Sequence, residues 1–197
     1  MENHNSNHGE KEVEGNVKTK NEWWEWTKAL AIAIVLAFVI RSLLFAPFVV
    51  DGASMMPTLQ DRERLIVTKL VYFIHDPSPG DIIVFHATQE RDYIKRVIGI
   101  GGDKLEMKND QLYINDQPVD EPYLNEYKKQ AQSEGYLLTE NFGPIEVPEG
   151  ELFVMGDNRG NSKDSRMIGT IPLESVVGRA DVIFWPLNQF RFPNNTD

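Results

Sequence analysis

The sequence predicts a mostly β domain preceded by one N-terminal transmembrane helix. The helix is predicted by an unbroken apolar run over residues 29–40. The β domain is predicted by short apolar or alternating segments after residue 46, separated by Pro, Gly, Asn and Asp. A chain of 197 residues with 41% hydrophobic and 25% charged residues can bury one core but hardly two. We therefore expect a single folded domain with appendages.

Composition excludes several functional classes. The formal net charge is -10, with 30 acidic and 20 basic residues, which argues against a nucleic-acid partner because such proteins present clustered Lys and Arg to phosphate. The chain has no cysteine, which excludes a disulfide framework, a thiolate zinc site and a cysteine nucleophile.

The N-terminal part is predicted to be a tail followed by an anchor. Residues 1–22 are polar and are expected to form a disordered cytoplasmic tail. Residues 23–46 are expected to form a transmembrane anchor, because Trp23, Trp24 and Trp26 match an interfacial belt and Arg41 lies near the end, where it can snorkel. Lysines before this segment favour a cytoplasmic N-terminus. A buried helix and a cleaved signal peptide are the alternatives.

Residues 47–197 are predicted to form an extracytoplasmic β domain. Strands are expected over residues 81–85, 93–98, 111–114, 151–155 and 176–184. Asn115 and Asp116 predict a hairpin tip. Residues 120–141 are polar and are expected to form a surface excursion, while residues 59–75 are compatible with either strand or helix.

Most types of catalytic or binding site can be excluded from the sequence. Two of the four histidines lie in the predicted tail, and His75 and His86 lack the spacing of a metal site. No pair of carboxylates stands out. The glycines of residues 99–102 lack the spacing of a dinucleotide fingerprint and fit a tight turn better. These observations leave an activated hydroxyl as the candidate, with no cofactor and no metal.

Ser54 is the candidate hydroxyl. It follows Gly52 and Ala53 and precedes two methionines and Pro57, so small neighbours would let a substrate backbone approach. The alternative is an ordinary turn serine.

Lys95 is the candidate base. Strand alternation surrounds it with apolar or aromatic side chains on either face, and burial lowers the pKa of a lysine towards neutrality. The alternative is an exposed lysine whose stem covers apolar neighbours.

Residues 156–166 form a third candidate segment. They are dense in hydrogen-bonding groups and directly follow an apolar strand, as functional loops often do. Asp164 and Arg166 are expected to pair, and a hydroxyl such as Ser162 could orient the Lys95 amine. A long turn without function has a similar composition.

Together these segments resemble type I signal peptidases, in the short form of Gram-positive bacteria. Residues 54–58 resemble the family's nucleophile box, residues 80–85 its next strand, residues 95–103 its lysine box and residues 156–166 its final box. Four boxes in order after an N-terminal anchor make the resemblance specific.

The resemblance implies a largely antiparallel domain of coiled β-sheets and a Ser/Lys dyad. Ser54 would be the nucleophile, Lys95 the general base and Ser162 the hydroxyl that orients Lys95. Asp164, Arg166 and Arg159 would support the site. Some members carry an oxyanion-binding hydroxyl two residues before the nucleophile, where this chain has Gly52. The family also implies a preference for small side chains at the first and third positions before the cut.

The sequence is therefore interpreted as a membrane-bound serine endopeptidase that removes signal peptides from exported preproteins. It would pass the cell membrane once, with the catalytic domain on the outer face, so its partners would be preproteins and the lipid bilayer. The rival interpretations are a catalytically inactive membrane-tethered β domain that binds exported chains, a self-cleaving regulator and a histidine-dependent hydrolase.

Overall fold

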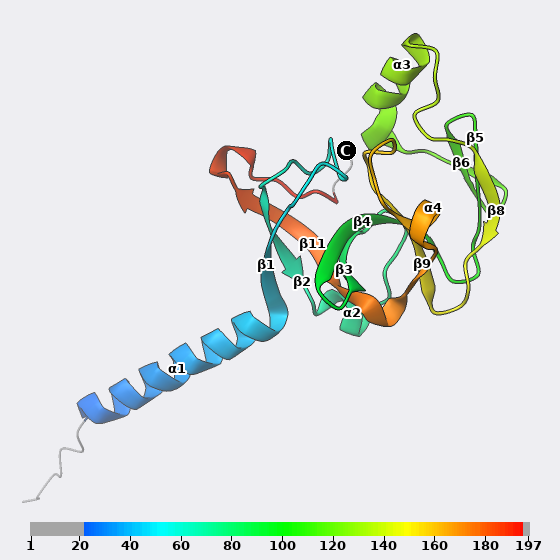
Figure 1. The fold of residues 1–197 in the computed structure, drawn as a ribbon. Coiled ribbons are helices and arrows are strands. Elements are labelled where there is room, and N and C mark those ends of the chain that lie inside the picture. Colours follow the sequence, from blue (N-terminus) through cyan, green and yellow to red (C-terminus); the bar gives the residue numbers. More distant parts are fainter. Residues whose placement is uncertain (1–21, 195–197) are drawn as a thin grey trace, which may run out of the picture. The chain divides into compact units, whose positions relative to one another are not determined.

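The computed structural model describes residues 22–194 (Figure 1). The tail predicted over residues 1–22 therefore lies outside the described residues, except for its last residue. The longest helix is α1 (Glu22–Leu44), and α2 (Val71–Ile74), α3 (Asn125–Ser133) and α4 (Ser165–Ile168) are shorter. Single 3-10 turns occur at Pro122–Leu124, Leu173–Ser175 and Leu187–Gln189.

Helix α1 covers most of the segment that was predicted as an anchor. Many of its described large apolar side chains are exposed, among them Trp23, Trp24 and Phe38. It ends at Leu44, and the next residue begins a strand, so the last two residues of the predicted anchor belong to the β domain. No helix within residues 22–194 combines the length and the apolarity that crossing a membrane requires.

The remainder of the described chain is mostly β, as predicted. The strands are β1 (Phe45–Val49), β2 (Arg64–Thr68), β3 (Ile82–Thr88), β4 (Arg91–Ile100), β5 (Lys104–Lys108), β6 (Gln111–Ile114), β7 (Gln117–Val119), β8 (Phe142–Glu146), β9 (Glu151–Met155), β10 (Ile171–Pro172) and β11 (Val176–Trp185). They form a seven-stranded sheet in the order β1-β2-β11-β3-β4-β9-β10 and a four-stranded sheet in the order β7-β6-β5-β8. Every pairing between them is antiparallel.

The five predicted strands appear as β3, β4, β6, β9 and β11, with ends that differ by at most three residues. The hairpin tip is where it was expected, because Asn115 and Asp116 have φ angles of 53° and 64°. The glycine turn joins the two sheets: Gly102, with φ 87°, lies between β4 and β5. The ambiguous residues 59–75 contain both β2 and α2.

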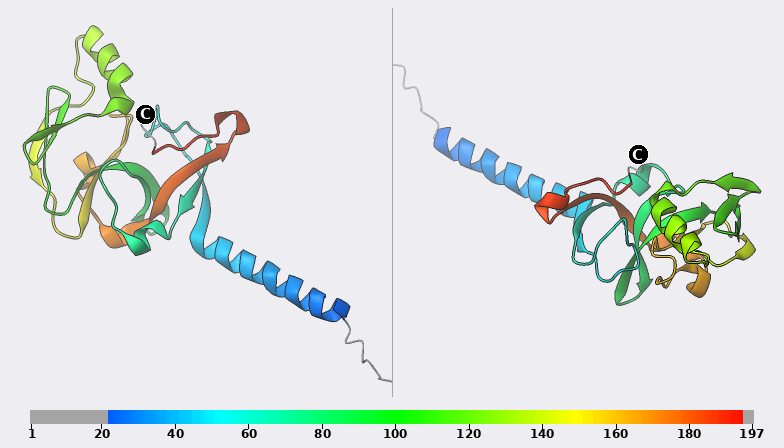
Figure 2. Two further views of the ribbon diagram at one scale, coloured as in Figure 1. Left: turned by 180° about the vertical axis from the view of Figure 1, so that it is seen from behind. Right: turned by 90° about the horizontal axis from the view of Figure 1, so that it is seen from above.

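The predicted surface excursion over residues 120–141 is only partly on the surface. It contains α3, which rises beside the four-stranded sheet in Figure 1 and in the left view of Figure 2. Glu121, Leu124, Ala131 and Thr139 within it are buried. The polar composition of this stretch gave no sign that these positions are buried, because two of the buried residues are themselves polar.

The centre of the large sheet is covered on both faces. Ile82 and Val84 of β3 belong to one buried cluster, whereas Ile83 and Phe85 belong to another. A third cluster, which includes Ile98 of β4, joins the large sheet to the four-stranded sheet. Because successive side chains of a strand point to opposite faces, both faces of β3 and β4 lie in the interior. Charged side chains at the centre of β4 are therefore held away from water.

Candidate active site

Ser54 lies in the loop that joins β1 to β2. The Met56 amide donates to the Ala53 carbonyl at 3.1 Å, which closes a tight turn around the serine. Met55 is only 1% exposed and anchors this turn in the core together with Leu59. The buried neighbour fixes the backbone on which the Ser54 hydroxyl is carried.

Lys95 reaches this hydroxyl from the middle of β4. Its Nζ lies 2.9 Å from Ser54 Oγ and donates to the Ile94 carbonyl at 2.8 Å. The lysine is only 3% exposed, and its Nζ lies 5.3 Å from the centre of the Tyr93 ring. The structure thus brings together the two residues that the sequence singled out, which are 41 positions apart.

The surroundings of Lys95 favour the neutral amine. Burial lowers its pKa from 10.5 to about 8, against the smaller opposing effect of Asp164 and Asp157, whose negative charges raise it. Desolvation disfavours the ammonium form because the protein interior solvates charge poorly. A lysine in this state can accept a proton at mildly alkaline pH.

Gly52 adopts a φ of 94°, a conformation that favours glycine. Its amide donates to the Asp61 carboxylate at 2.8 Å, so Asp61 fixes the approach to the nucleophile. Gly52 brings no side-chain hydroxyl to the site.

The loop of residues 156–166 follows β9 and is held by Asp164. This carboxylate accepts the Gly156 amide at 2.9 Å and pairs with the Arg166 guanidinium through two contacts of 2.8 Å. Burial alone would raise the pKa of Asp164, but Arg166 and the Gly156 amide outweigh it and keep this pKa below its ordinary value. The expected pairing of Asp164 with Arg166 is therefore present.

Gly156 lies where the loop of residues 156–166 meets Ser54. A Cβ at this position would lie 2.4 Å from the Ser54 carbonyl oxygen and 2.2 Å from Ser162 Oγ, distances that real contacts do not reach. The Asn158 amide donates to the same Ser54 carbonyl at 3.0 Å. Only glycine permits this close approach.

Ser162 is close to the site but does not contact Lys95 through a hydrogen bond. Its Oγ is buried and meets no partner in strict hydrogen-bond geometry among the described residues, but it lies close enough to Asp164 to help lower the pKa of that carboxyl. The role that the resemblance implies for it, orientation of the lysine amine, is not visible in this geometry. The Ile94 carbonyl is the protein group, besides Ser54, to which the amine donates.

Arg159 belongs to a different network from Asp164. Its guanidinium forms a buried ion pair with Glu121 and also contacts Thr139 and Tyr123, while its Nε donates to the Gly156 carbonyl at 3.2 Å. The Lys128 amine also donates to the Glu121 carboxylate, with 3.0 Å between Nζ and Oε2. Burial would raise the pKa of Glu121, but the Arg159 and Lys128 charges and their hydrogen bonds hold it below its ordinary value.

Arg96 and Asp157 form a second buried ion pair that the sequence reasoning missed. Two contacts of 2.9 and 2.7 Å join the Arg96 guanidinium to the Asp157 carboxylate, which also accepts a hydrogen bond from the Thr58 hydroxyl. Arg96 donates further to the Gly80 carbonyl at 2.8 Å and lies 3.9 Å from the centre of the Tyr123 ring. Burial lowers the pKa of Arg96, but Asp157 outweighs this effect and raises it. Arg96 lies in the lysine box, Asp157 in the final box and Thr58 in the nucleophile box. This membership was the signal that could have suggested the pair.

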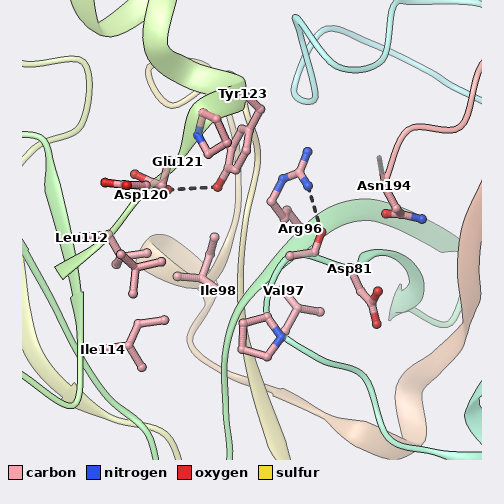
Figure 3. A pocket seen from close by; sticks show the side chains of 14 residues that line it. Asp81, Arg96, Val97, Ile98, Leu112, Ile114, Asp120, Glu121, Tyr123 and Asn194 are labelled. Atoms are coloured by element: carbon pink, nitrogen blue, oxygen red, sulfur yellow. Dashed lines mark hydrogen bonds between the residues drawn. The ribbon is translucent and has the colours of Figure 1, made fainter. Parts of the chain in front are cut away.

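Figure 3 shows the cavity beside this second pair, with Arg96 donating to a backbone oxygen and Tyr123 donating to Glu121. It measures about 310 Å³ and is lined by residues that include Ile98, Leu112 and Asp120. The cavity contains neither Ser54 nor Lys95.

The cavity that does contain both residues measures about 350 Å³. Phe48, Val49 and Val50 form its apolar part with Tyr93 and Ile94, and Asp51, Asp92 and Lys163 add charge. The sequence did not single out these three charged residues, because charged side chains are common on any protein surface. Neither His75 nor His86 lines this cavity, although His86 contacts Asp92 at 2.6 Å.

The Glu121–Arg159 pair should be important for stability. Replacement Glu121→Gln leaves the Arg159 charge buried without its partner, so we expect a loss of about 3–5 kcal/mol in the free energy of unfolding. Denaturant titration measures this change. The matched control is Glu126→Gln, whose exposed pair with Lys129 should contribute little. Equal stability of the two variants would show that the buried pair is not needed.

Comparison with known proteins identifies the family of this chain. Residues 23–185 match the family described as "Signal peptidase, peptidase S26". Signal peptidase I of Bacillus amyloliquefaciens is 51% identical over 168 residues, which cover 85% of this chain and 90% of that protein. Signal peptidase I S of Bacillus subtilis (strain 168) is 49% identical over 181 residues, covering 91% and 98%. A crystal structure of a signal peptidase I from Enterococcus faecalis V583 is 36% identical with a TM-score of 0.49, covering 53% of this chain and 96% of that chain. The chain belongs to the signal peptidase family, peptidase S26.

Proposed function

We propose that this protein is a serine endopeptidase that removes signal peptides from exported preproteins, with Ser54 as nucleophile and Lys95 as general base. The observation that carries the assignment of residues is the 2.9 Å separation between Lys95 Nζ and Ser54 Oγ inside the protein. Membership of the signal peptidase family supports the reaction and the class of substrate.

The reaction begins with the neutral Lys95 amine, which accepts the proton of the Ser54 hydroxyl as Oγ attacks the carbonyl carbon of the scissile bond. The ammonium that forms returns this proton to the leaving amine, and the carbon–nitrogen bond breaks to give an acyl-enzyme. Lys95, neutral again, then accepts a proton from water as the water oxygen attacks the ester. Ser54 recovers its hydrogen and the signal peptide leaves with a carboxyl group.

The oxyanion that develops on the carbonyl oxygen requires a hydrogen-bond donor. We assign this role to the backbone amide of Ser54. Gly52 supplies no hydroxyl, and its own amide is already engaged by Asp61. The loop around Gly52 therefore acts by holding the nucleophile turn in place.

We also propose that α1 attaches the catalytic domain to a lipid bilayer. Its exposed tryptophans and leucines present apolar surface that water solvates poorly, and amphipathic tryptophan rings favour the membrane interface. The further proposal of a single passage, with the N-terminus in the cytoplasm and the β domain on the outer face, rests on the sequence and on the family. Strand β1 follows α1 directly and leads to Ser54, which suits substrates whose apolar segment is still in the membrane.

The pH dependence of cleavage should report the Lys95 amine. Because the protonated amine is inactive as a base, kcat/KM should rise about tenfold per pH unit below about 8 and level off above it. Replacement Ser54→Ala or Lys95→Ala should lower it by at least roughly a thousandfold at every pH. Retained function in both variants would favour the inactive binding domain instead. Loss of activity on replacement of His75 and His86 would favour the histidine-dependent alternative.

Gly156→Ala should abolish most of the activity. The added methyl group would displace the Ser54 carbonyl or Ser162, and a shift of about 1 Å at a catalytic group typically costs roughly a hundredfold in rate. Cleavage of a preprotein by the purified protein measures the effect. Gly160→Ala is the control, since a Cβ there meets no atom within 4 Å. Wild-type activity in Gly156→Ala would contradict the close approach described above.

The membrane topology can be tested on protoplasts that carry the protein with an N-terminal epitope tag. External protease should digest the β domain and leave the tag intact, and the protein should remain in the membrane after alkaline carbonate extraction. Digestion of the tag together with the β domain would exclude the proposed passage, and release by carbonate would indicate peripheral attachment of α1.

A further inference from the structure

A groove separate from the catalytic cavity begins at the same loop. It measures about 700 Å³ and is lined by Tyr127, Tyr136 and Leu137 from the excursion, by Phe142 of β8, and by Ser162 and Met167. We call it the Ser162 groove. Lys163, the residue after Ser162, lines the catalytic cavity, so consecutive residues of this loop line the two hollows.

The groove starts beside the nucleophile. The site of a Gly156 Cβ lies 2.4 Å from the Ser54 carbonyl oxygen and 2.2 Å from Ser162 Oγ, so these two atoms are near neighbours. Asn158, which also lines the groove, donates its backbone amide to Ser54 and its side-chain amide to the Ala53 carbonyl, both at 3.0 Å. The wall of the groove is therefore hydrogen-bonded to the backbone of the nucleophile turn.

The lining of the groove is suited to a polypeptide. Four large side chains of the groove are exposed: Tyr127 by 39%, Tyr136 by 52%, Leu137 by 43% and Met167 by 73%. Large apolar side chains that gather on a surface usually mark a binding site. The groove also has a polar wall, which includes Glu140, Asn141 and Arg166. The apolar side chains can bury an aliphatic or aromatic side chain of a peptide, and the polar wall can bond its backbone.

An endopeptidase must accommodate its substrate on both sides of the cleaved bond. The apolar part of the catalytic cavity comes from the end of β1 and the residue after it, which follow α1 in the chain, and it suits the signal-peptide side of a preprotein. The part of the substrate that follows the cleaved bond must then extend along residues 156–163. Given the proposed function, we propose that the Ser162 groove binds the first residues of the mature part of the preprotein and favours an aliphatic or aromatic side chain there.

Three substrates with the same signal peptide test this inference. In the first the mature part is cut short after about two residues, and in the second it extends for about ten, enough to run some 30 Å beyond the cleaved bond. A third substrate has the longer mature part with its apolar residues replaced by serine. Wild-type protein should cleave the longer apolar substrate with a kcat/KM roughly tenfold higher than the other two, as expected for burial of one large side chain.

The double replacement Tyr136→Ser with Leu137→Ser should remove this advantage and leave cleavage of the short substrate unchanged. The matched control is Phe73→Ser, an 82% exposed residue of α2 that lines neither hollow. Its kinetics should equal those of the wild type on all substrates. Unchanged cleavage of the short substrate also shows that the double variant is folded.

Two results would overturn the inference alone: equal kcat/KM of the wild type for the short and the longer substrates, or an equal loss on both in the double variant. Failure of the wild type to cleave any of them would overturn the proposed function as well. The two failures are therefore distinguishable.

Discussion

The buried ion pair between Arg96 and Asp157 holds together three segments that are distant in the sequence. Arg96 is the neighbour of Lys95 on β4, Asp157 is the neighbour of Gly156, and Thr58 of the nucleophile loop donates its hydroxyl to the same carboxylate. Removal of one partner would leave a charge unpaired in the interior, which typically costs about 3–5 kcal/mol. The distance between the Ser54 hydroxyl and the Lys95 amine therefore depends on groups that hydrogen-bond to neither of these two atoms.

Lys95 and Arg96 show how two adjacent bases acquire opposite properties. Both are almost completely buried, yet Arg96 has a carboxylate within 2.7 Å whereas no ion pair of the described residues includes Lys95. Direct pairing outweighs burial for the guanidinium and keeps it charged, while burial dominates for the amine and lowers its pKa. Because strand alternation places the two side chains on opposite faces of β4, one strand provides a structural cation and a neutralisable base.

The sequence predicted the parts of the molecule that follow from local pattern. Alternation and turn residues located β3, β4, β6, β9 and β11, and the four boxes located Ser54, Lys95 and the Asp164–Arg166 pair. The features that the sequence did not predict depend on tertiary contacts. Arg96 and Asp157 pair across 61 positions of the chain, and Glu121 is buried in a stretch whose polar composition suggested solvent. Ser162 also shows this limit, since a spacing between boxes does not determine which atom a hydroxyl contacts.

The dyad joins two positions 41 residues apart, and its supporting carboxylates come from still further along the chain. Contacts between such remote segments form late, because closing long loops is entropically unfavourable before the sheets assemble. A growing or partly folded chain consequently contains the serine and the lysine but no reactive pair. Synthesis can thus proceed without premature proteolysis of neighbouring chains, and hydrolytic capacity emerges only once β9 and the loop that follows it have joined the sheet.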